Sequence, residues 1–400
     1  MQARRMIAFL CFISFVVLGV GTSILGPTLT HLTSFINLPL AEAGILRAVQ
    51  NFGSVFATFA AGYFLGRYAL RNVIVPSLVM MAIGLAGMIV TPNLGLALAA
   101  DMLFGAGTGV LNVACNVAIS TLYTEHSAPM LSALHTCFGL GLFAGPLIAG
   151  QLLGQPTGWS ITYVFPSIAC LILGAIFLLV LTSNPIHTET PQNGRPSAEP
   201  VSEHASRPAV HWLPLLPLIV LLFLYNGAGN GMSDWIAPHL QLLGGVSAET
   251  AAQLASLYGL ALTTGRAIGI AALHRFASLR VMSVGLGLAV VGAALIVLAG
   301  PTVGLIAVGA ALVGLGFSPI YPNVMALAGQ QQPDNRGVVT GVVAGIASIG
   351  GILMPVIQGW VGGGQSGGMI VTLLAALVMV SAYSQIRAPG GSASHELSTD

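Results

Sequence analysis

The feature that most constrains this chain is a succession of apolar stretches, each about 20 residues long and almost free of charge. The chain has 400 residues, of which 55% are hydrophobic and only 6% are charged. A soluble domain carries about 25% charged residues, so this sequence cannot cover a water-facing surface. Because about 20 apolar residues are the length that crosses a bilayer as an α-helix, the sequence predicts a polytopic membrane protein. A soluble enzyme and a DNA-binding protein are excluded.

Twelve stretches reach this length, and they predict an all-α fold with twelve transmembrane helices. They are residues 6–28, 44–66, 72–91, 95–121, 131–153, 161–182, 213–236, 250–271, 280–299, 303–327, 338–360 and 367–386. The alternating strands of about 10 residues that are typical of a membrane β-barrel are absent. The first run follows Arg4 and Arg5 and continues without a clear cleavage site, so we interpret it as a span and not as a signal peptide.

The placement of arginine predicts the orientation of the chain. Ten of the twelve basic residues fall in segments on the side of the N-terminus: Arg4, Arg5, Arg67, Arg71, Arg195, Arg207, Arg275, Arg280, Arg336 and Arg387. By the positive-inside rule, both termini are expected in the cytoplasm, with the protein in the bacterial inner membrane. The formal net charge of +1 offers nucleic acid no basic surface. The four cysteines lie in apolar runs and are predicted to be buried thiols: Cys11, Cys115, Cys137 and Cys170.

A polar segment divides the spans into six and six. Residues 183–212 are rich in Pro, Ser, Thr and charge, and such a composition cannot bury enough apolar surface to order itself. We therefore expect four parts along the chain. They are an N-terminal six-helix bundle over residues 1–182, a cytoplasmic linker over 183–212, a C-terminal six-helix bundle over 213–387, and a cytoplasmic tail over 388–400.

The two halves repeat each other at a nearly constant offset. The repeated residues are Gly107, Gly109 and Asn116 with Gly314, Gly316 and Asn323; Arg67 and Arg71 with Arg275 and Arg280; and Pro146 and Gly150 with Pro355 and Gly359. An even number of spans in each half makes this a parallel repeat. Parallel six-span halves are the organisation of the major facilitator superfamily.

Several motifs resemble that superfamily, most closely its fucose-permease-like branch. The segment from Gly62 to Arg71 is similar to the family's loop after the second helix, with Gly66 where the family has Asp. Segments similar to the fifth, seventh and tenth helices of the branch are Leu134–Gly141 with Gly145 and Pro146, Tyr225–Trp235, and Phe317–Pro322. The resemblance implies a cofactor-free transporter that works as a monomer by alternating access. Gly229 stands where relatives often carry Glu, so proton coupling does not carry over residue by residue.

Polar residues at helical spacing predict where a substrate binds. The second span carries Arg47, Asn51, Ser54 and Thr58 on one face, and the fourth and seventh spans carry similar polar stripes. A polar stripe is costly against lipid, so it faces a partner helix or a water-filled cavity. The expected substrate contacts are Asn112, Asn116, Asn226 and Asn230, with Gln50, Asn51, Tyr321 and Asn323 as second choices.

Charged residues inside the spans predict coupling and gating. Asp101 and Asp234 are the candidates for proton coupling, and Arg47 is placed to pair with Asp101 and close the outer side. The expected gating residues are Arg47, Arg67, Arg71, His135, Arg266 and Arg275. Arg266 is alternatively a contact for an anionic substrate. No metal-ligand spacing, nucleophile motif or nucleotide-binding motif stands out, so we expect neither an enzyme, nor a metal, nor a cofactor.

The function that these features favour is secondary transport of a small polar solute, with or without protons. Amides and hydroxyls match the donors and acceptors of sugar hydroxyls, so a sugar or polyol is the preferred substrate and sugar symport the expected activity. Efflux of apolar compounds and transport of small carboxylates remain alternatives within the same fold. A transporter-like sensor, which binds a ligand without moving it, is the alternative of another class.

Overall fold

The computed structural model describes residues 2–65, 67–90, 92–124, 127–183, 210–362 and 368–386. Within these ranges the chain forms helices and turns and no strand, so the all-α prediction is confirmed. The linker and tail predicted at 183–212 and 388–400, together with Gly66, fall largely or wholly outside the described residues.

Within the described residues, the first half contains eight helices, one of them a short 3-10 turn. They are α1 (Gln2–Ser23), α2 (Leu25–Phe35), η1 (Leu40–Glu42), α3 (Gly44–Leu65), α4 (Arg71–Val90), α5 (Leu94–Leu122), α6 (Ser127–Leu152) and α7 (Gly158–Ser183). The second half contains η3 (Leu213–Leu215), α8 (Leu216–Leu242), α9 (Ala248–Leu273), α10 (Ser278–Leu298), α11 (Val303–Phe317), α12 (Ile320–Gln331), η4 (Pro333–Asn335), α13 (Arg336–Gly362) and α14 (Met369–Ser384).

Two of the twelve predicted spans are longer than expected and broken. The first continues past residue 28 to Phe35, with α1 ending at Ser23 and α2 beginning at Leu25. Pro27 lies in the first turn of α2, where its missing N–H is tolerated. The tenth span continues to Gln331 and breaks at Pro319. Counted as one span each, α1 with α2 and α11 with α12 complete the twelve segments.

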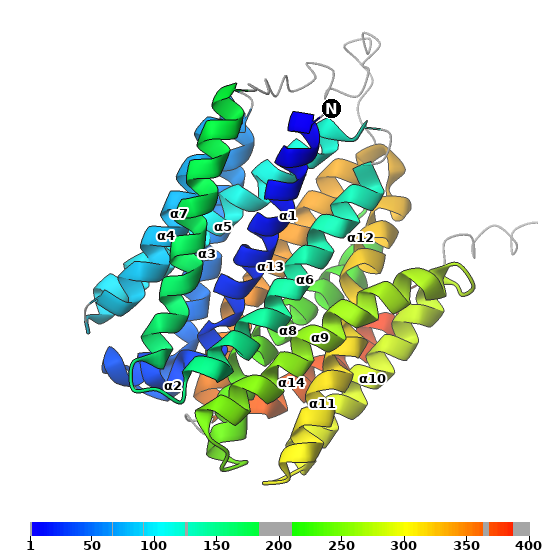
Figure 1. The fold of residues 1–400 in the computed structure, drawn as a ribbon. Helices are drawn as coiled ribbons and strands as arrows, with labels where there is room; N and C mark the ends of the chain where they lie inside the picture. Colours follow the sequence, from blue (N-terminus) through cyan, green and yellow to red (C-terminus); the bar gives the residue numbers. More distant parts are fainter. Residues whose placement is uncertain are drawn as a thin grey trace, which may run out of the picture.

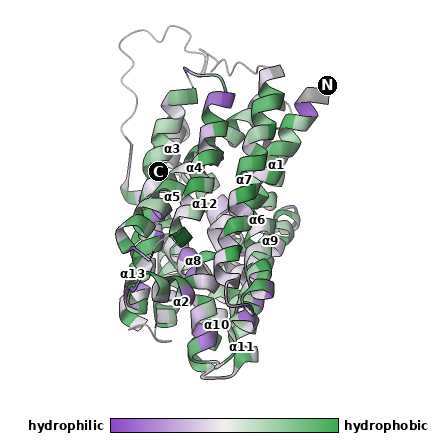
Figure 2. Cartoon of the chain, turned by 60° about the vertical axis from the view of Figure 1, so that its left-hand side comes forward, coloured by the Kyte–Doolittle hydropathy of each residue, from purple (hydrophilic) through white to green (hydrophobic). Residues whose placement is uncertain are grey.

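The helices have the length and composition of membrane spans. In the part of the chain that the structure describes, ten helical segments are long and apolar enough to cross a bilayer, and Met369–Ser384 is a shorter apolar helix. Green, hydrophobic residues dominate the helices, and purple residues gather near several helix ends (Figure 2). The 22-residue α3 is not among the ten segments, although it has the length of a span. Its polar residues, Arg47, Gln50 and Asn51 among them, lower its mean hydropathy.

The same set of helix pairs packs together in each half. In the first half α1 packs on α6, α3 and α4 pack on α5, and α4 packs on α7. In the second half α8 packs on α13, α9 and α10 pack on α11, and α10 packs on α14. In Figure 1, α4 and α7 lie at the left and α10 and α11 at the lower right, with α1, α6, α8 and α13 between them. This duplication confirms the pseudo-repeat within the fold.

Glycine contacts correct the register that the sequence predicts for one helix pair. A methyl group at Gly105 would lie 1.9 Å from the backbone carbonyl oxygen of Gln50 on α3. A methyl group at Gly314 would lie 2.5 Å from the backbone carbonyl oxygen of Tyr258 on α9. Because α3 and α9 are equivalent, Gly105 matches Gly314 at an offset of 209. The predicted match of Gly107 with Gly314, and with it the match of Asn116 with Asn323, is therefore wrong by two residues.

The bundle has two ends that differ in charge and closure. We call the end that carries Arg4, Arg67 and Arg275 the basic end, and the end that carries α2 the α2 end. The N-terminus lies at the top of Figure 1, at the basic end, and α2 lies at the lower left. The halves touch through α2 on α8 and α9, α3 on α13, and α6 on α9.

Candidate functional site

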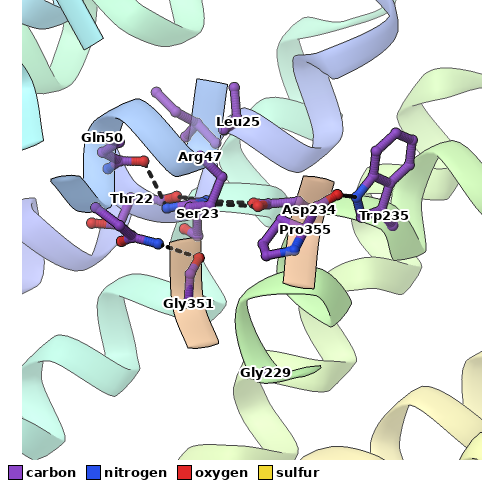
Figure 3. Close-up of polar contacts among 12 residues, drawn as sticks. Thr22, Ser23, Leu25, Arg47, Gln50, Gly229, Asp234, Trp235, Gly351 and Pro355 are labelled. Carbon is purple, nitrogen blue, oxygen red and sulfur yellow. Dashed lines mark hydrogen bonds and ion pairs between the residues drawn. The ribbon is translucent and has the colours of Figure 1, made fainter. Parts of the chain in front are cut away.

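A buried arginine holds the two halves together near the α2 end. Arg47 on α3 donates from Nε to Asp234 Oδ2 on α8 over 2.8 Å, and its Nη2 forms a second bond to Asp234 Oδ1. Arg47 also donates to Gln50 Oε1 at 2.8 Å and to the Thr22 carbonyl oxygen at 2.9 Å. Arg47 and Asp234 are only 2% and 3% exposed. Figure 3 shows Arg47 between Gln50 and Asp234. The result is a bidentate, desolvated ion pair across the interface.

A second carboxylate lies beside this pair. Asp101 on α5 is 2% exposed and interacts electrostatically with both Arg47 and Asp234. Its Oδ2 has no hydrogen-bond partner among the described residues. The predicted pairing of Arg47 with Asp101 is therefore wrong, because Asp234 from the other half takes the Nε–Nη2 edge of the guanidinium and Nη1 donates to Gln50. We call Arg47, Asp101 and Asp234 the charged cluster.

Backbone contacts between the halves close the α2 end. A methyl group at Gly44 would lie 2.3 Å from the Pro355 carbonyl oxygen, and one at Gly26 would lie 2.2 Å from the Ser233 oxygen. Both glycines belong to the first half and both oxygens to the second, so only glycine permits this approach. Trp235 Nε1 donates to the Pro355 oxygen at 3.2 Å, which fixes α13 against α8 at the same level (Figure 3).

Three of the predicted asparagines converge on a single glycine. A methyl group at Gly351 would lie 2.8 Å from Asn230 Nδ2, 3.2 Å from Asn226 Nδ2 and 3.3 Å from Asn51 Nδ2. Asn51 donates across the interface to the Gly351 oxygen at 2.7 Å, and Asn226 donates to the Ala347 oxygen at 2.9 Å. No such bond is found for Asn230 among the described residues. We call Asn51, Asn226 and Asn230 the amide cluster; it lies about one turn below Arg47 on α3.

Two more of the predicted asparagines lie closer to the basic end. Asn116 Nδ2 donates to Asn112 Oδ1 at 3.1 Å and to the Asn112 carbonyl oxygen at 2.7 Å, so the two form a pair on α5. They share a helix face with Gly105, which packs on α3 at the level of Gln50. Asn112 is therefore about two turns from that level, toward the basic end.

The halves separate toward the basic end. Gly62 lies on the same face of α3 as Gly44 and Asn51, at i+18 and i+11, so it points toward α13. A methyl group at Gly62 would have no atom within 4 Å, and the same holds at Gly341 on the facing helix. The interface between α3 and α13 is therefore tight at Gly44 and open at Gly62, and the amide cluster lies at the inner limit of this opening.

The remaining second-choice contacts divide into two groups. Gln50 lies beside the charged cluster, where its Oε1 accepts a hydrogen bond from Arg47. Tyr321 is 41% exposed, and its ring centroid lies 6.2 Å from that of Tyr225, on the second half. Asn323 points elsewhere, because it accepts from Ser278 Oγ at 2.5 Å and donates to the Pro319 oxygen at 2.6 Å. Asn323 thus fastens α12 to α10 within one half, and its prediction as a substrate contact is not supported.

The predicted gating residues at the basic end make no ion pair between the halves among the described residues. Arg67 lies over the Tyr63 ring, with 4.0 Å between Cζ and the ring centroid, and Arg71 donates to Thr182 at 3.5 Å. Arg275 is exposed.

The two halves also meet where α6 packs on α9. His135 on α6 interacts electrostatically with Arg266 on α9, and its ring centroid lies 5.6 Å from that of Phe15. Arg266 also interacts with Tyr321, so it faces the region between the halves. No ion pair to Arg266 is found in the part of the chain that the structure describes.

Sequence reasoning missed two residues of this region. The three asparagines of the amide cluster meet at Gly351. Gly351 is one of 51 glycines, so nothing in the sequence distinguishes it. Tyr163 on α7 is buried, bonds Thr28 Oγ1 at 2.8 Å and interacts electrostatically with Asp101. A tyrosine in an apolar run is ordinary for a membrane helix, so only the fold reveals that it borders the charged cluster.

Comparison with known proteins agrees with this architecture. The family model described as Major Facilitator Superfamily matches residues 11–355. The chain belongs to this superfamily. It is an integral membrane transporter and not an enzyme.

Relatives in the superfamily are distant in sequence. The chain is 23% identical to the "Protein TsgA homolog" of Edwardsiella ictaluri over 89% of this chain and 88% of that protein. It is 29% identical to the "Sodium-dependent glucose transporter 1A" of Mus musculus, over 34% of this chain and 32% of that protein.

Solved superfamily structures share the fold at low identity. A D-xylose-proton symporter aligns with a TM-score of 0.73 and 15% identity, over 93% of this chain and 96% of that one. A bacterial homologue of the human lysosomal transporter Spinster, in an inward-facing and unoccupied conformation, aligns with a TM-score of 0.73 and 14% identity, over 97% and 99%.

Proposed function

We propose that this superfamily member moves a small neutral polar solute, best a sugar or polyol, across the bacterial inner membrane with protons as the driving ion. The positive-inside rule supports placing the basic end and both termini in the cytoplasm. The conformation described above is then inward-facing, closed at the α2 end and open at the basic end. Alternating access follows when the halves rock about the region between the two clusters.

The observation that carries the substrate class is the convergence of the amide cluster at Gly351. Carboxamides offer both donors and acceptors without charge, which is what a hydroxyl-rich neutral solute needs. Asn51 comes from the first half, and Asn226 and Asn230 come from the second. A solute bound there touches both halves, so its binding affects how they close. The tyrosine rings at Tyr225 and Tyr321 add flat apolar surface of the kind that polar-solute sites combine with a few polar groups.

The names of two similar proteins support this class. A "Sodium-dependent glucose transporter" and a "D-xylose-proton symporter" are both named for sugars, although one matches over a third of this chain and the other only in fold. The proposal therefore rests on the amide cluster, and these names are secondary.

One observation favours a second candidate, a small carboxylate. Arg266 is half-buried, faces the region between the halves and has no ion pair among the described residues. A cation without a partner inside a membrane protein suits an anionic ligand. The carboxylate arm of the experiment below decides between the two candidates.

Counterflow in proteoliposomes tests the proposal and its site. Vesicles are loaded with unlabelled solute, and entry of labelled solute is followed for a panel of neutral sugars, polyols, small carboxylates and lipophilic cations. We expect counterflow with neutral sugars or polyols. Counterflow with carboxylates alone would replace the sugar assignment by the Arg266 candidate, and no counterflow with any member would contradict the transport function.

Asn230→Ala is expected to raise the half-saturating concentration of the transported solute about 2- to 12-fold. The reason is that one hydrogen bond contributes about 0.5–1.5 kcal/mol and 1.4 kcal/mol is tenfold. Asn230 has no hydrogen bond to lose within the described residues, so the fold is expected to be intact. Asn93→Ala is the matched control, since Asn93 only accepts from Leu96 N at 2.9 Å as the cap of α5. An unchanged value for Asn230→Ala would remove the amide cluster from the site.

A further inference from the structure

The charged cluster contains one base and two acids. Arg47, Asp101 and Asp234 are each at most 3% exposed, so bulk water does not solvate their charges. If both carboxyl groups were ionised, the cluster would hold a net negative charge in a low-dielectric interior, which costs several kcal/mol per unpaired ion. A single bound proton makes the cluster neutral. The composition of the cluster therefore calls for one protonated carboxyl group.

The hydrogen bonds decide which carboxyl group carries this proton. Both oxygens of Asp234 accept from Arg47, an arrangement that requires an ionised carboxylate. Asp101 Oδ2 accepts no hydrogen bond within the described residues, and an ionised oxygen without donors is the costly case. The proton thus belongs on Asp101.

The groups around Asp101 come from three helices. Arg47 on α3, Asp234 on α8 and Tyr163 on α7 interact with it electrostatically. The helices α1, α4 and α6 also pack on α5, which carries Asp101. In their described parts, no further charged group interacts with Asp101. Arg47 is the single cation in this environment, so any negative charge that appears on Asp101 acts first on Arg47.

The position of Asp101 makes its charge matter for closure. Asp101 and Arg47 belong to the first half, whereas Asp234 belongs to the second. An ionised Asp101 competes for Arg47 from within the same half and weakens the bond that crosses the interface. A neutral Asp101 leaves Arg47 entirely to Asp234. Proton binding at Asp101 and closure of the α2 end are therefore coupled, and by linkage each favours the other.

We propose that Asp101 is the binding site of the coupling proton and that its protonation directs Arg47 to Asp234, which closes the α2 end. When the α2 end is open, the ionised carboxylate takes a proton from water and becomes a neutral acid. The reverse step returns the proton to water and restores the carboxylate. The claim that this proton is coupled to solute transport rests on the proposed function. The claim that protonation of Asp101 closes the α2 end does not require a solute.

The first test follows the conformation and needs no solute. Spin labels are attached at Pro92→Cys and Pro301→Cys, two exposed loop positions at the α2 end on opposite halves, with the four native cysteines replaced by alanine. Electron–electron distances are measured in lipid nanodiscs during a pH titration. We expect the shorter distance to gain population as the pH falls. A distribution that does not respond to pH would overturn the proposal.

Three variants separate the roles in that titration. Asp101→Asn mimics the neutral acid and is expected to give the same mixture of distances at every pH, with the short distance in the majority. Asp234→Asn removes the partner in the other half and is expected to keep the long distance at every pH. Tyr163→Phe removes the remaining titratable neighbour and is expected to titrate like the parent protein. An Asp101→Asn variant that titrates like the parent would also overturn the proposal.

A transport measurement separates this inference from the proposed function. In proteoliposomes with an imposed pH gradient, Asp101→Asn is expected to retain counterflow and to lose accumulation above the outside concentration. Uphill accumulation by Asp101→Asn would refute the proton site while leaving the transport function intact. Absence of counterflow in the parent protein would refute the transport function, and the pH titration of the distances would still decide the proton site.

Discussion

Replacing Arg47 with alanine is expected to lower the free energy of unfolding by about 3–5 kcal/mol, because it leaves the Asp234 carboxylate buried without its cation. Both oxygens of Asp234 lose their donors, and Asp101 loses the only positive charge nearby. The measurement is the thermal unfolding midpoint in detergent, compared with the parent protein.

An arginine at the basic end provides the control for this prediction. Arg67 is exposed and stacks on Tyr63, so Arg67→Ala is expected to cost only about 0.5–1 kcal/mol. Replacing both members of the ion pair, as in Arg47→Met with Asp234→Leu, is expected to restore most of the lost stability. Equal effects of Arg47→Ala and Arg67→Ala would show that the charged cluster does not hold the halves together.

Gly44→Val is expected to reduce counterflow about 5- to 150-fold, because it prevents the α2 end from closing. Even a methyl group at Gly44 would lie 2.3 Å from the Pro355 oxygen and 2.6 Å from the Val356 Cα, both backbone atoms of the other half. Neither can yield without separating the halves. An overpacked contact costs about 1–3 kcal/mol, which sets the expected range at tenfold per 1.4 kcal/mol.

The matched control for Gly44→Val is a glycine with open surroundings. A methyl group at Gly287 on α10 would meet no atom within 4 Å, so Gly287→Ala is expected to transport like the parent protein. Both variants are expected to fold, since Gly44 lies at the contact between halves and outside the core of either half. Full counterflow by Gly44→Val would contradict closure through α3 and α13.

Much of the fold follows from the sequence, because apolar length fixes each membrane span. All twelve predicted spans have a helical counterpart. The breaks at Ile24 and Pro319 were not predicted, since an apolar run reads the same whether its helix is straight or interrupted. The repeat register of α5 and α11 was also mistaken, because glycines at i and i+2 give equally good matches when shifted by two residues.

The candidate site was predictable to the level of residue types on helix faces, and partners were not. Helical spacing placed Asn51, Asn226 and Asn230 on inward faces, and the structure brings them together at Gly351. Which acid would pair with Arg47 depended on how two halves dock, which is a long-range property. Periodicity along one helix carries no information on that docking, so it does not identify Asp234 as the partner of Arg47.

The central claim is that the halves rock about the region between the charged cluster and the amide cluster, so that the two ends of the molecule open in turn. The most direct measurement uses two spin-label pairs in separate samples, Pro92 with Pro301 at the α2 end and Tyr68 with Phe276 at the basic end, each residue replaced by labelled cysteine. Asp234→Asn is compared with the parent protein at one pH. The account predicts that the distance at the α2 end lengthens while the distance at the basic end shortens. Two distances that change in the same direction, or that both stay fixed, would contradict it.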